Sequence, residues 1–318
     1  MQAEDKSAFA QLHIAVFLFG FTAILGKLIS ADHFTLVFHR MWLAALGFFF
    51  MPGFIKALKG TQAKHLLQLL GIGVLVSIHW ITFYGSIKIG HSASLTLGCF
   101  GLTSTFTSVL EPLIYRKKMV KKDVLLGLLA LLGIAIIAYA SPSQNGQSGN
   151  YLLAVGVGVF STFVAALFST INSTLTNSIN TKVMSFTELI GGFLFLAVLL
   201  FSGWHMDHIL PTNDFLPWPT TTHPQFIDSV YADFIWIALL ALVCTNVAFV
   251  MNLNAMKRVS AFTANLAINL EPVYGIVLAA LIFNEHDNLT PGFYIGASII
   301  LSCVLIHAYM KTRDKQHS

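Results

Sequence analysis

The sequence predicts an all-α membrane protein of ten transmembrane helices, arranged as two inverted repeats of five helices each. Composition, recurring apolar windows and the sorting of positive charge predict this fold class. Of the 318 residues, 56% are hydrophobic and only 10% are charged, whereas soluble domains contain about 25% charged residues. A mean hydropathy of +0.74 agrees with this. Little chain is left for a soluble domain, and no nucleic-acid partner is expected.

Apolar windows long enough to cross a bilayer recur along almost the whole chain. A membrane-spanning helix needs about 20 mostly apolar residues to cross about 30 Å of hydrocarbon. No small-residue cleavage site of the A-x-A kind follows the first window, so we expect a retained helix there and not a signal peptide. The ten expected spans are residues 11–30, 34–54, 66–87, 92–114, 123–141, 151–173, 182–203, 231–255, 261–283 and 291–310.

The three cysteines, Cys99, Cys244 and Cys303, all fall inside expected spans. This placement favours small packing residues over a disulfide framework or a zinc cluster. The sequence also contains no Gly-rich phosphate loop that would indicate ATP-driven transport. We therefore expect neither a metal site nor a cofactor.

When the N-terminus is placed on the cytoplasmic side, most Lys and Arg residues fall on that same side of the membrane. Of the 18 Lys and Arg residues, only Lys27, Arg40 and Lys88 then fall outside the inner face, and the segment 204–230 contains none. The positive-inside rule therefore predicts that both termini are cytoplasmic. The outer loop 204–230 is expected to rest on the outer surface, with a lid over the substrate path as the alternative.

The two halves of the chain resemble each other. The stretch GSIKIGHSASLT from Gly85 aligns, after a one-residue shift, with NAMKRVSAFTAN from Asn254. Because five spans per half is an odd number, the second repeat, 151–310, is expected to lie upside down relative to the first, 11–141. Inverted repeats of this kind characterise secondary transporters, whose substrate site lies near the bilayer midplane.

Together, these features resemble the EamA type of the drug/metabolite transporter superfamily, over roughly residues 11–310. The most specific part is the stretch from Leu270-Glu271-Pro272-Val273 to Asn284-Glu285, a proline-containing span that ends in an acidic residue. In the first half, LTLGCFGLTSTFTSVLEP has no proline before Pro112. The resemblance implies a transporter in the bacterial inner membrane that moves a metabolite or amino acid, commonly by export.

Two Leu-Glu-Pro triplets occur in the expected spans, and their surroundings predict different roles. Glu111 lies near the inner end of its span and is followed by Arg116, which favours a structural role at the interface. Glu271 lies near the middle of its span, about 15 Å from either end at ~1.5 Å per residue. Acidic groups at that depth are costly and usually face a partner or a water-filled path. We predict that Glu271 lines the substrate path; a neutral group that hydrogen-bonds a neighbouring helix is the alternative.

Pro272 removes a backbone donor and tends to kink a helix, so it is the predicted hinge beside a cavity. Asn265 and Asn269 are four residues apart and share one helix face. These two asparagines, with Asn246 of the eighth span, are predicted to lie along the substrate path. A role in hydrogen bonds between helices, at about 0.6 kcal/mol each, is an equal alternative.

Three cations are expected at the outer ends of the first three spans. Lys27, Arg40 and Lys88 would there form a vestibule that attracts carboxylates, with snorkelling to the interface as the default alternative. Lys27 lies about three residues inside the end of its span. We therefore predict substrate contact for Lys27 first and for Arg40 second.

The third span contains the stretch IHWITFYGS, with His79, Trp80 and Tyr84. Trp80 and Tyr84 share a helix face, which suits stacking on a flat or apolar substrate. His79 is a candidate proton relay near neutral pH. Helix packing is the alternative for all three.

The leading hypothesis is a secondary transporter, not an enzyme, that moves a small amphoteric metabolite such as an amino acid by alternating access. Its partners would be the substrate, the lipid bilayer and a coupling proton. An intramembrane enzyme is an alternative, but neither H-E-x-x-H nor G-x-S-x-G occurs and no paired aspartates lie within the spans. A channel is a third possibility, which single-channel currents would reveal.

Overall fold

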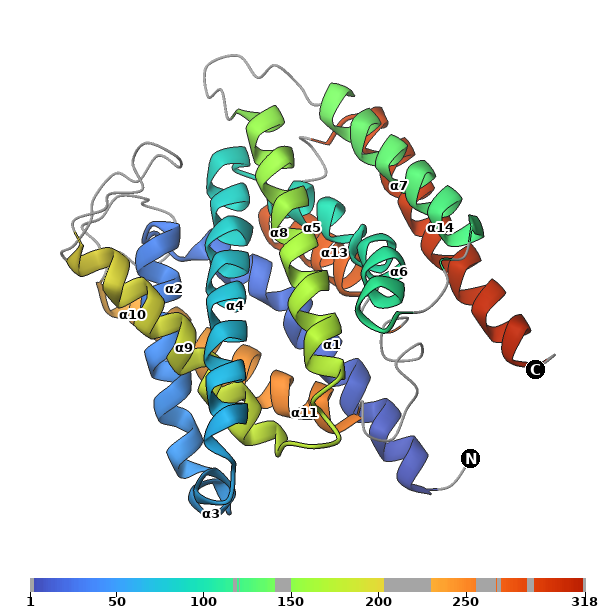
Figure 1. Cartoon of the computed structure of the whole chain (residues 1–318). Coiled ribbons are helices and arrows are strands. Elements are labelled where there is room, and N and C mark those ends of the chain that lie inside the picture. The colour runs from blue at the N-terminus through green and yellow to red at the C-terminus, as the bar shows by residue number, and fades with distance from the viewer. Residues whose placement is uncertain are drawn as a thin grey trace.

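The computed structural model describes residues 3–116, 119, 121–140, 150–202, 230–255, 267, 270–284 and 289–316. These residues form helices and turns, with no strand among them. Figure 1 shows the helices as one bundle, with α7 and α14 paired along one edge. The helices of the first half are α1 (Ala3–Leu28), α2 (His33–Gly47), the short 3-10 helix η1 (Phe48–Phe50), α3 (Phe54–Lys59), α4 (Ala63–Gly90), α5 (Ala93–Phe100), α6 (Thr103–Ile114) and α7 (Lys121–Ala140). Those of the second half are α8 (Tyr151–Ser173), α9 (Thr181–Phe201), α10 (Val230–Ala241), the π-helix η3 (Leu242–Val247), α11 (Ala248–Ala255), α13 (Glu271–Phe283) and α14 (Pro291–Gln316).

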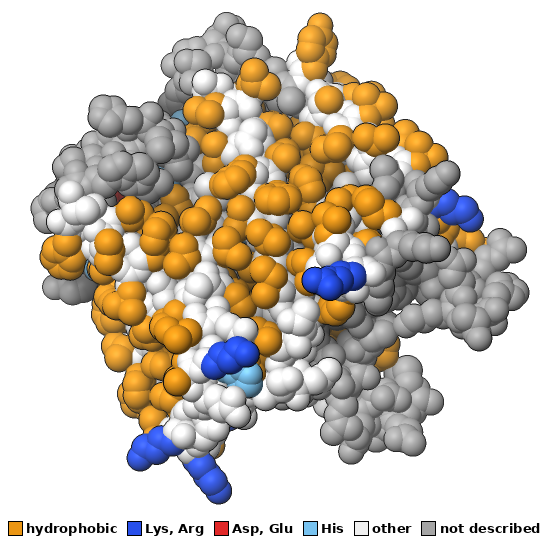
Figure 2. Space-filling view, in the orientation of Figure 1, with side chains coloured by type: hydrophobic (Ala, Val, Ile, Leu, Met, Phe, Trp, Pro, Cys, Tyr) orange, Lys and Arg blue, Asp and Glu red, His pale blue; other side chains and the backbone are white. Residues whose placement is uncertain are grey.

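The described helices make this a multi-pass membrane protein. Seven stretches are long and apolar enough to cross a bilayer: Ser7–Leu28, His33–Phe50, Ala63–Gly90, Ala93–Ile114, Tyr151–Ser173, Thr181–Phe201 and Ala232–Ala255. Three shorter apolar helices accompany them: Leu125–Ile137, Glu271–Phe283 and Pro291–Cys303. Hydrophobic side chains cover much of the face in Figure 2, as expected for a surface in contact with lipid.

Each expected span coincides with helix in the described residues, and the count of ten membrane crossings stays a prediction. The fourth expected span differs from a single rod, because α5 ends at Phe100 and α6 begins at Thr103. Gly101 lies in the break, and a Cβ atom built there would be 2.6 Å from a side-chain carbon of Ile300 in α14. The sequence carries no signal for this break, since neither Gly101 nor Leu102 forbids a helix.

The eighth expected span contains a π-helix between α10 and α11. The Thr245 hydroxyl donates a 2.8 Å hydrogen bond to the carbonyl of Leu240, five residues earlier. Such short π segments interrupt α-helices frequently at functional sites. The segment widens the helix where Thr245 and Asn246 face the interior, and both side chains are buried.

Contacts between the two halves come in reciprocal pairs. The third span, α4, packs against α8 and α9, while the eighth span, α10 to α11, packs against α1 and α2. The ninth, α13, packs against α1, while the fourth, α5 and α6, packs against the sixth, α8. The fifth and tenth, α7 and α14, pack against each other. Each contact of a span in the first half with the second half therefore has a counterpart, made by the equivalent span of the second half with the first half.

The crossing of α1 and α13 is unusually close. A Cβ atom built on Gly20 of α1 would be 3.0 Å from the Glu271 carbonyl oxygen and 3.1 Å from the Gly275 nitrogen, both in the backbone of α13. Small residues permit such close approach of helices in membranes. This crossing fixes the position of the first turn of α13 against α1.

Candidate functional site

Arg40 lies midway along α2 and is 3% exposed, in the interior of the bundle. Its Nε donates a 2.9 Å hydrogen bond to the Thr245 hydroxyl, and one terminal nitrogen donates a 2.7 Å hydrogen bond to the Tyr84 hydroxyl. The expectation of an outer-end position for Arg40 is wrong. The helix α2 carries it inward, where a charged group requires partners from other helices.

Trp80 and Tyr84 of α4 hold the guanidinium of Arg40 from one side. Its central carbon lies 3.6 Å from the ring centroid of Trp80 and 5.8 Å from that of Tyr84. Trp80 in turn stacks on Phe249 of α11, with ring centroids 6.0 Å apart. The predicted shared face of Trp80 and Tyr84 is therefore present, and it is occupied by a cation through cation–π contact.

Glu271 is the first residue of α13 and is 6% exposed. Pro272 directly follows it, in the first turn, where a missing N–H is tolerated because the first four N–H groups of a helix lack partners. The role of Pro272 as a hinge stays a prediction. The N-terminus of a helix carries partial positive charge, so the carboxyl of Glu271 lies at the end that favours an anion.

Arg40 and Glu271 are near enough to interact electrostatically, and Glu271 acts on Tyr84 in the same way. We call Arg40, Tyr84, Thr245 and Glu271 the central polar cluster. Arg40 and Tyr84 come from the first half of the chain, and Thr245 and Glu271 from the second. A buried cation and a buried acid therefore lie within electrostatic range of each other where the two halves join.

The central polar cluster has the chemistry to hold a small amphoteric molecule. A guanidinium has five N–H donors in a fixed fork, and the hydrogen bonds to Tyr84 and Thr245 use two of them. The fork matches a carboxylate, while the carboxyl of Glu271 suits an ammonium group. The aromatic face of Trp80 lies beside the guanidinium and offers apolar contact.

Lys27 lies near the C-terminal end of α1. Its ammonium group lies 4.6 Å from the ring centroid of Phe283, at the last residue of α13. Nearby, the Asp233 carboxylate of α10 accepts hydrogen bonds from the backbone N–H groups of Ser30 (3.0 Å) and Ala31 (3.2 Å). Lys27 therefore belongs to the end of the bundle where α1 leads into α2, as the sequence predicts.

His79 faces α8, with its Nδ1 2.8 Å from the Ser161 hydroxyl oxygen and 3.1 Å from the Ser161 carbonyl oxygen. The Ser161 hydroxyl donates a 2.9 Å hydrogen bond back to the His79 carbonyl. The imidazole also packs on Phe83, Phe100 and Phe168. These contacts fit the packing alternative for His79.

Asn246 joins η3 to α2, because its Nδ2 donates a 2.8 Å hydrogen bond to the carbonyl of Ala44. Its Oδ1 is a buried acceptor without a hydrogen-bond partner. Asn246 thus holds two helices together next to Thr245. Asn265, Asn269 and most of the outer loop 204–230 lie outside the described residues.

Two interior polar residues escaped the sequence analysis. Thr245 could have been found only from the π-helix, because a threonine within an apolar span carries no signal of its own. Glu188 is 4% exposed in α9. It lies inside the expected span 182–203, so the depth criterion applied to Glu271 would have identified it.

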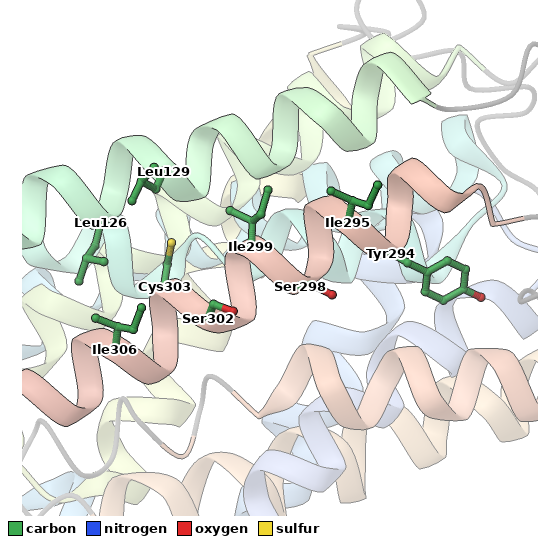
Figure 3. Close-up of a pocket in the computed structure, with 9 residues that line it drawn as sticks. All are labelled: Leu126, Leu129, Tyr294, Ile295, Ser298, Ile299, Ser302, Cys303 and Ile306. Carbon is green, nitrogen blue, oxygen red and sulfur yellow. The ribbon is translucent and has the colours of Figure 1, made fainter.

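A surface groove lies along α14 beside α7, at the edge of the bundle. Figure 3 shows its lining, with Leu126 and Leu129 from α7 and Ser298, Ser302 and Cys303 among the α14 residues. The lining contains no charged side chain and no member of the central polar cluster. Within the described ranges, no group of three or more His, Cys, Asp or Glu residues is placed to hold a metal ion.

Comparison with known proteins gives matches at the level of family and fold. The model of the EamA-like transporter family matches residues 7–139 and 152–308. Significant matches to solved structures number 24 chains. One, described as "Crystal structure of protein", has a TM-score of 0.60 and 13% sequence identity, and the similarity covers 97% of this chain and 98% of that chain. At this identity the likeness concerns the fold alone. No curated protein sequence matches the chain.

Proposed function

The chain belongs to the EamA-like transporter family, and from that premise we propose that it is a secondary transporter that exports a small amphoteric metabolite, such as an amino acid, by alternating access. Membrane transporters, not enzymes, make up this family. The substrate class and the direction are our proposal. The observation that carries it is the burial of Arg40 and Glu271 within electrostatic range of each other inside the bundle.

The placement of these two groups supports a substrate site. Ionisable residues within a membrane are costly and usually mark a substrate or ion path. Arg40 and Glu271 lie at the junction between the halves, which is where transporters built from repeats bind their substrates. A carboxylate would pair with the fork of Arg40 and an ammonium group with Glu271, with Trp80 contacting an apolar side chain.

We propose that the two halves are inverted repeats that rock against each other about this site. The reciprocal contacts between spans support a two-fold relation between them. The breaks in the fourth and ninth spans support it further. Beyond the one-residue shift the offset between the aligned stretches is 168, as from Ser92 to Ser260, and adding it to Gly101 gives position 269, two residues before the start of α13 at Glu271.

The same proposal places both termini in the cytoplasm and the chain in a bacterial inner membrane. The sorting of Lys and Arg supports this orientation. Lys88, Asp233 and the turn after α1 would then lie on the outer side, where the Lys88 ammonium hydrogen-bonds the Ile29 carbonyl. Cysteine labelling from either side of a sealed vesicle tests this arrangement.

Transport by purified protein in liposomes tests the function. Vesicles loaded with a pool of amino acids, organic acids and nucleosides are diluted, and the compounds released are identified by mass spectrometry. We expect selective, saturable release with counterflow, abolished by E271Q in protein that elutes as the wild type does. Selective release that E271Q leaves unchanged contradicts the site, and the absence of release from folded wild-type protein contradicts the proposed substrate classes.

A further inference from the structure

A second carboxyl lies inside the bundle, apart from the central polar cluster. Glu188 of α9 is 4% exposed and lies seven residues after Thr181, the first residue of that helix. At ~1.5 Å per residue this is about 11 Å along the helix axis, beyond the reach of a Glu side chain to the interface. The backbone at Glu188 packs tightly on Gly73 of α4. The backbone that carries this carboxyl is therefore held against α4.

Among the described residues, the polar group that acts on Glu188 as a hydrogen-bond partner is the side-chain amide of Asn172 in α8. Both side chains nevertheless keep a buried acceptor without a partner, namely Oε1 of Glu188 and Oδ1 of Asn172. Asn172 is 7% exposed. Two orphan acceptors on contacting side chains indicate that a hydrogen atom is needed between or beside them.

The charged groups around α9 offer Glu188 no counter-ion. The titratable side chains on the helices that pack against α9, on α9 itself and on α8 are Lys56, Lys59, Lys64, His65, His79, Tyr84, Lys88, His33, His39, Arg40, Lys182 and Tyr151. None of these groups is among the influences on the Glu188 carboxyl, which among the described residues are its burial and Asn172. Glu271, in contrast, is acted on by Arg40. An ionised Glu188 would be a buried charge without a partner of opposite sign, which proteins avoid.

We propose that Glu188 and Asn172 form a proton-binding site, in which the carboxyl of Glu188 carries a proton and donates it in a hydrogen bond. Binding converts a carboxylate and one proton into a neutral carboxylic acid, so the buried charge disappears and one orphan acceptor becomes a donor. The inference rests on the proposed transport function, within which this proton is the coupling ion. Uptake from one side and release to the other would drive substrate against its gradient, while Glu271 remains engaged with Arg40 and substrate.

The E188Q variant in proteoliposomes tests the coupling, because glutamine has nearly the same shape but binds no proton. Counterflow of the transported compound at equal pH on both sides measures substrate exchange. Accumulation driven by a pH gradient measures coupling. We expect E188Q to retain counterflow and to lose gradient-driven accumulation, down to the level reached without a gradient, whereas E271Q loses both. Gradient-driven accumulation at the wild-type level in E188Q overturns the proton site. Absence of counterflow in the wild type instead overturns the proposed transport function.

Infrared spectroscopy provides a test that needs no substrate. In reconstituted E271Q protein near neutral pH, we expect the carbonyl band of a protonated carboxylic acid. The band should shift in the E271Q/N172A double variant, which removes only the partner, and disappear in E271Q/E188Q. Lack of the band in folded E271Q protein shows that Glu188 is ionised and overturns the inference, even if E188Q itself fails to fold.

Discussion

The two Leu-Glu-Pro triplets have the same letters and opposite positions in their helices. In the first half, Glu111 and Pro112 lie near the C-terminal end of α6, and Glu111 is half-buried. In the second half, Glu271 and Pro272 form the beginning of α13, and Glu271 is buried. A helix N-terminus attracts a carboxylate and tolerates proline, whereas a position near the C-terminus does neither.

The role of a Leu-Glu-Pro triplet therefore depends on whether it lies at the beginning or near the end of its helix, and not on its letters alone. Pro112 lies inside α6 and leaves the carbonyl of Ser108, four residues earlier, without its helical donor. Pro272 removes an N–H that had no partner in any case. The first triplet therefore lies near the end of a helix, while the second begins a helix inside the bundle, within electrostatic range of Arg40.

The largest expected effect separates the two glutamates directly. We expect E271Q to lower the initial transport rate by about 100-fold or more, because it removes a group that pairs with substrate or Arg40. The matched E111Q variant should stay within about twofold of the wild type, since an interfacial carboxyl contributes little. Initial rates of counterflow at equal amounts of reconstituted protein measure both. Similar losses of transport rate in E271Q and E111Q would contradict the different roles assigned to the two glutamates.

A smaller effect is expected from the partner of Glu271. R40K keeps the positive charge but loses the planar fork that contacts Tyr84 and Thr245. We expect the apparent affinity for substrate to fall by about tenfold, equivalent to ~1.4 kcal/mol, with the maximal rate less affected. Concentration dependence of counterflow checks this. An unchanged affinity would show that Arg40 only supports the fold.

A stability effect tests how α13 is held in position. G20A places a Cβ atom against the backbone of Glu271 and Gly275, so we expect a loss of about 1–3 kcal/mol in the free energy of unfolding. G71A is the control, because a Cβ atom at Gly71 meets nothing within 4 Å. Thermal unfolding in detergent measures both. Equal stability of the two variants would mean that the crossing of α1 and α13 tolerates separation.

The smallest expected effect concerns the two prolines. P112A restores a donor for the Ser108 carbonyl and should stabilise the protein by about 1 kcal/mol. P272A changes a position in the first turn, so its stability should stay within about 0.5 kcal/mol of the wild type. The same thermal unfolding assay measures both. A larger change in stability from P272A than from P112A would contradict the expectation that a proline in the first turn of a helix costs less than one in its interior.

The sequence predicted the membrane class, the approximate span limits and the family, because hydropathy and charge sorting are local properties of the chain. It also identified Glu271, since the depth of a residue in its span follows from counting. It placed Arg40 at an outer end, because span limits alone did not show how far α2 carries it inward. The break between α5 and α6 escaped as well, since neither Gly101 nor Leu102 forbids a helix.

Only the packing of the helices decided which polar groups meet. Trp80 faces Arg40 while its neighbour His79 faces Ser161, and this difference depends on how α4 is rotated against α2 and α8. Rotation is set by the contacts of every neighbouring helix at once, which no single span contains. For the same reason Arg40 lies within electrostatic range of Glu271, 231 positions away in the printed sequence. Among the described residues, Glu188 instead has Asn172 as its polar neighbour.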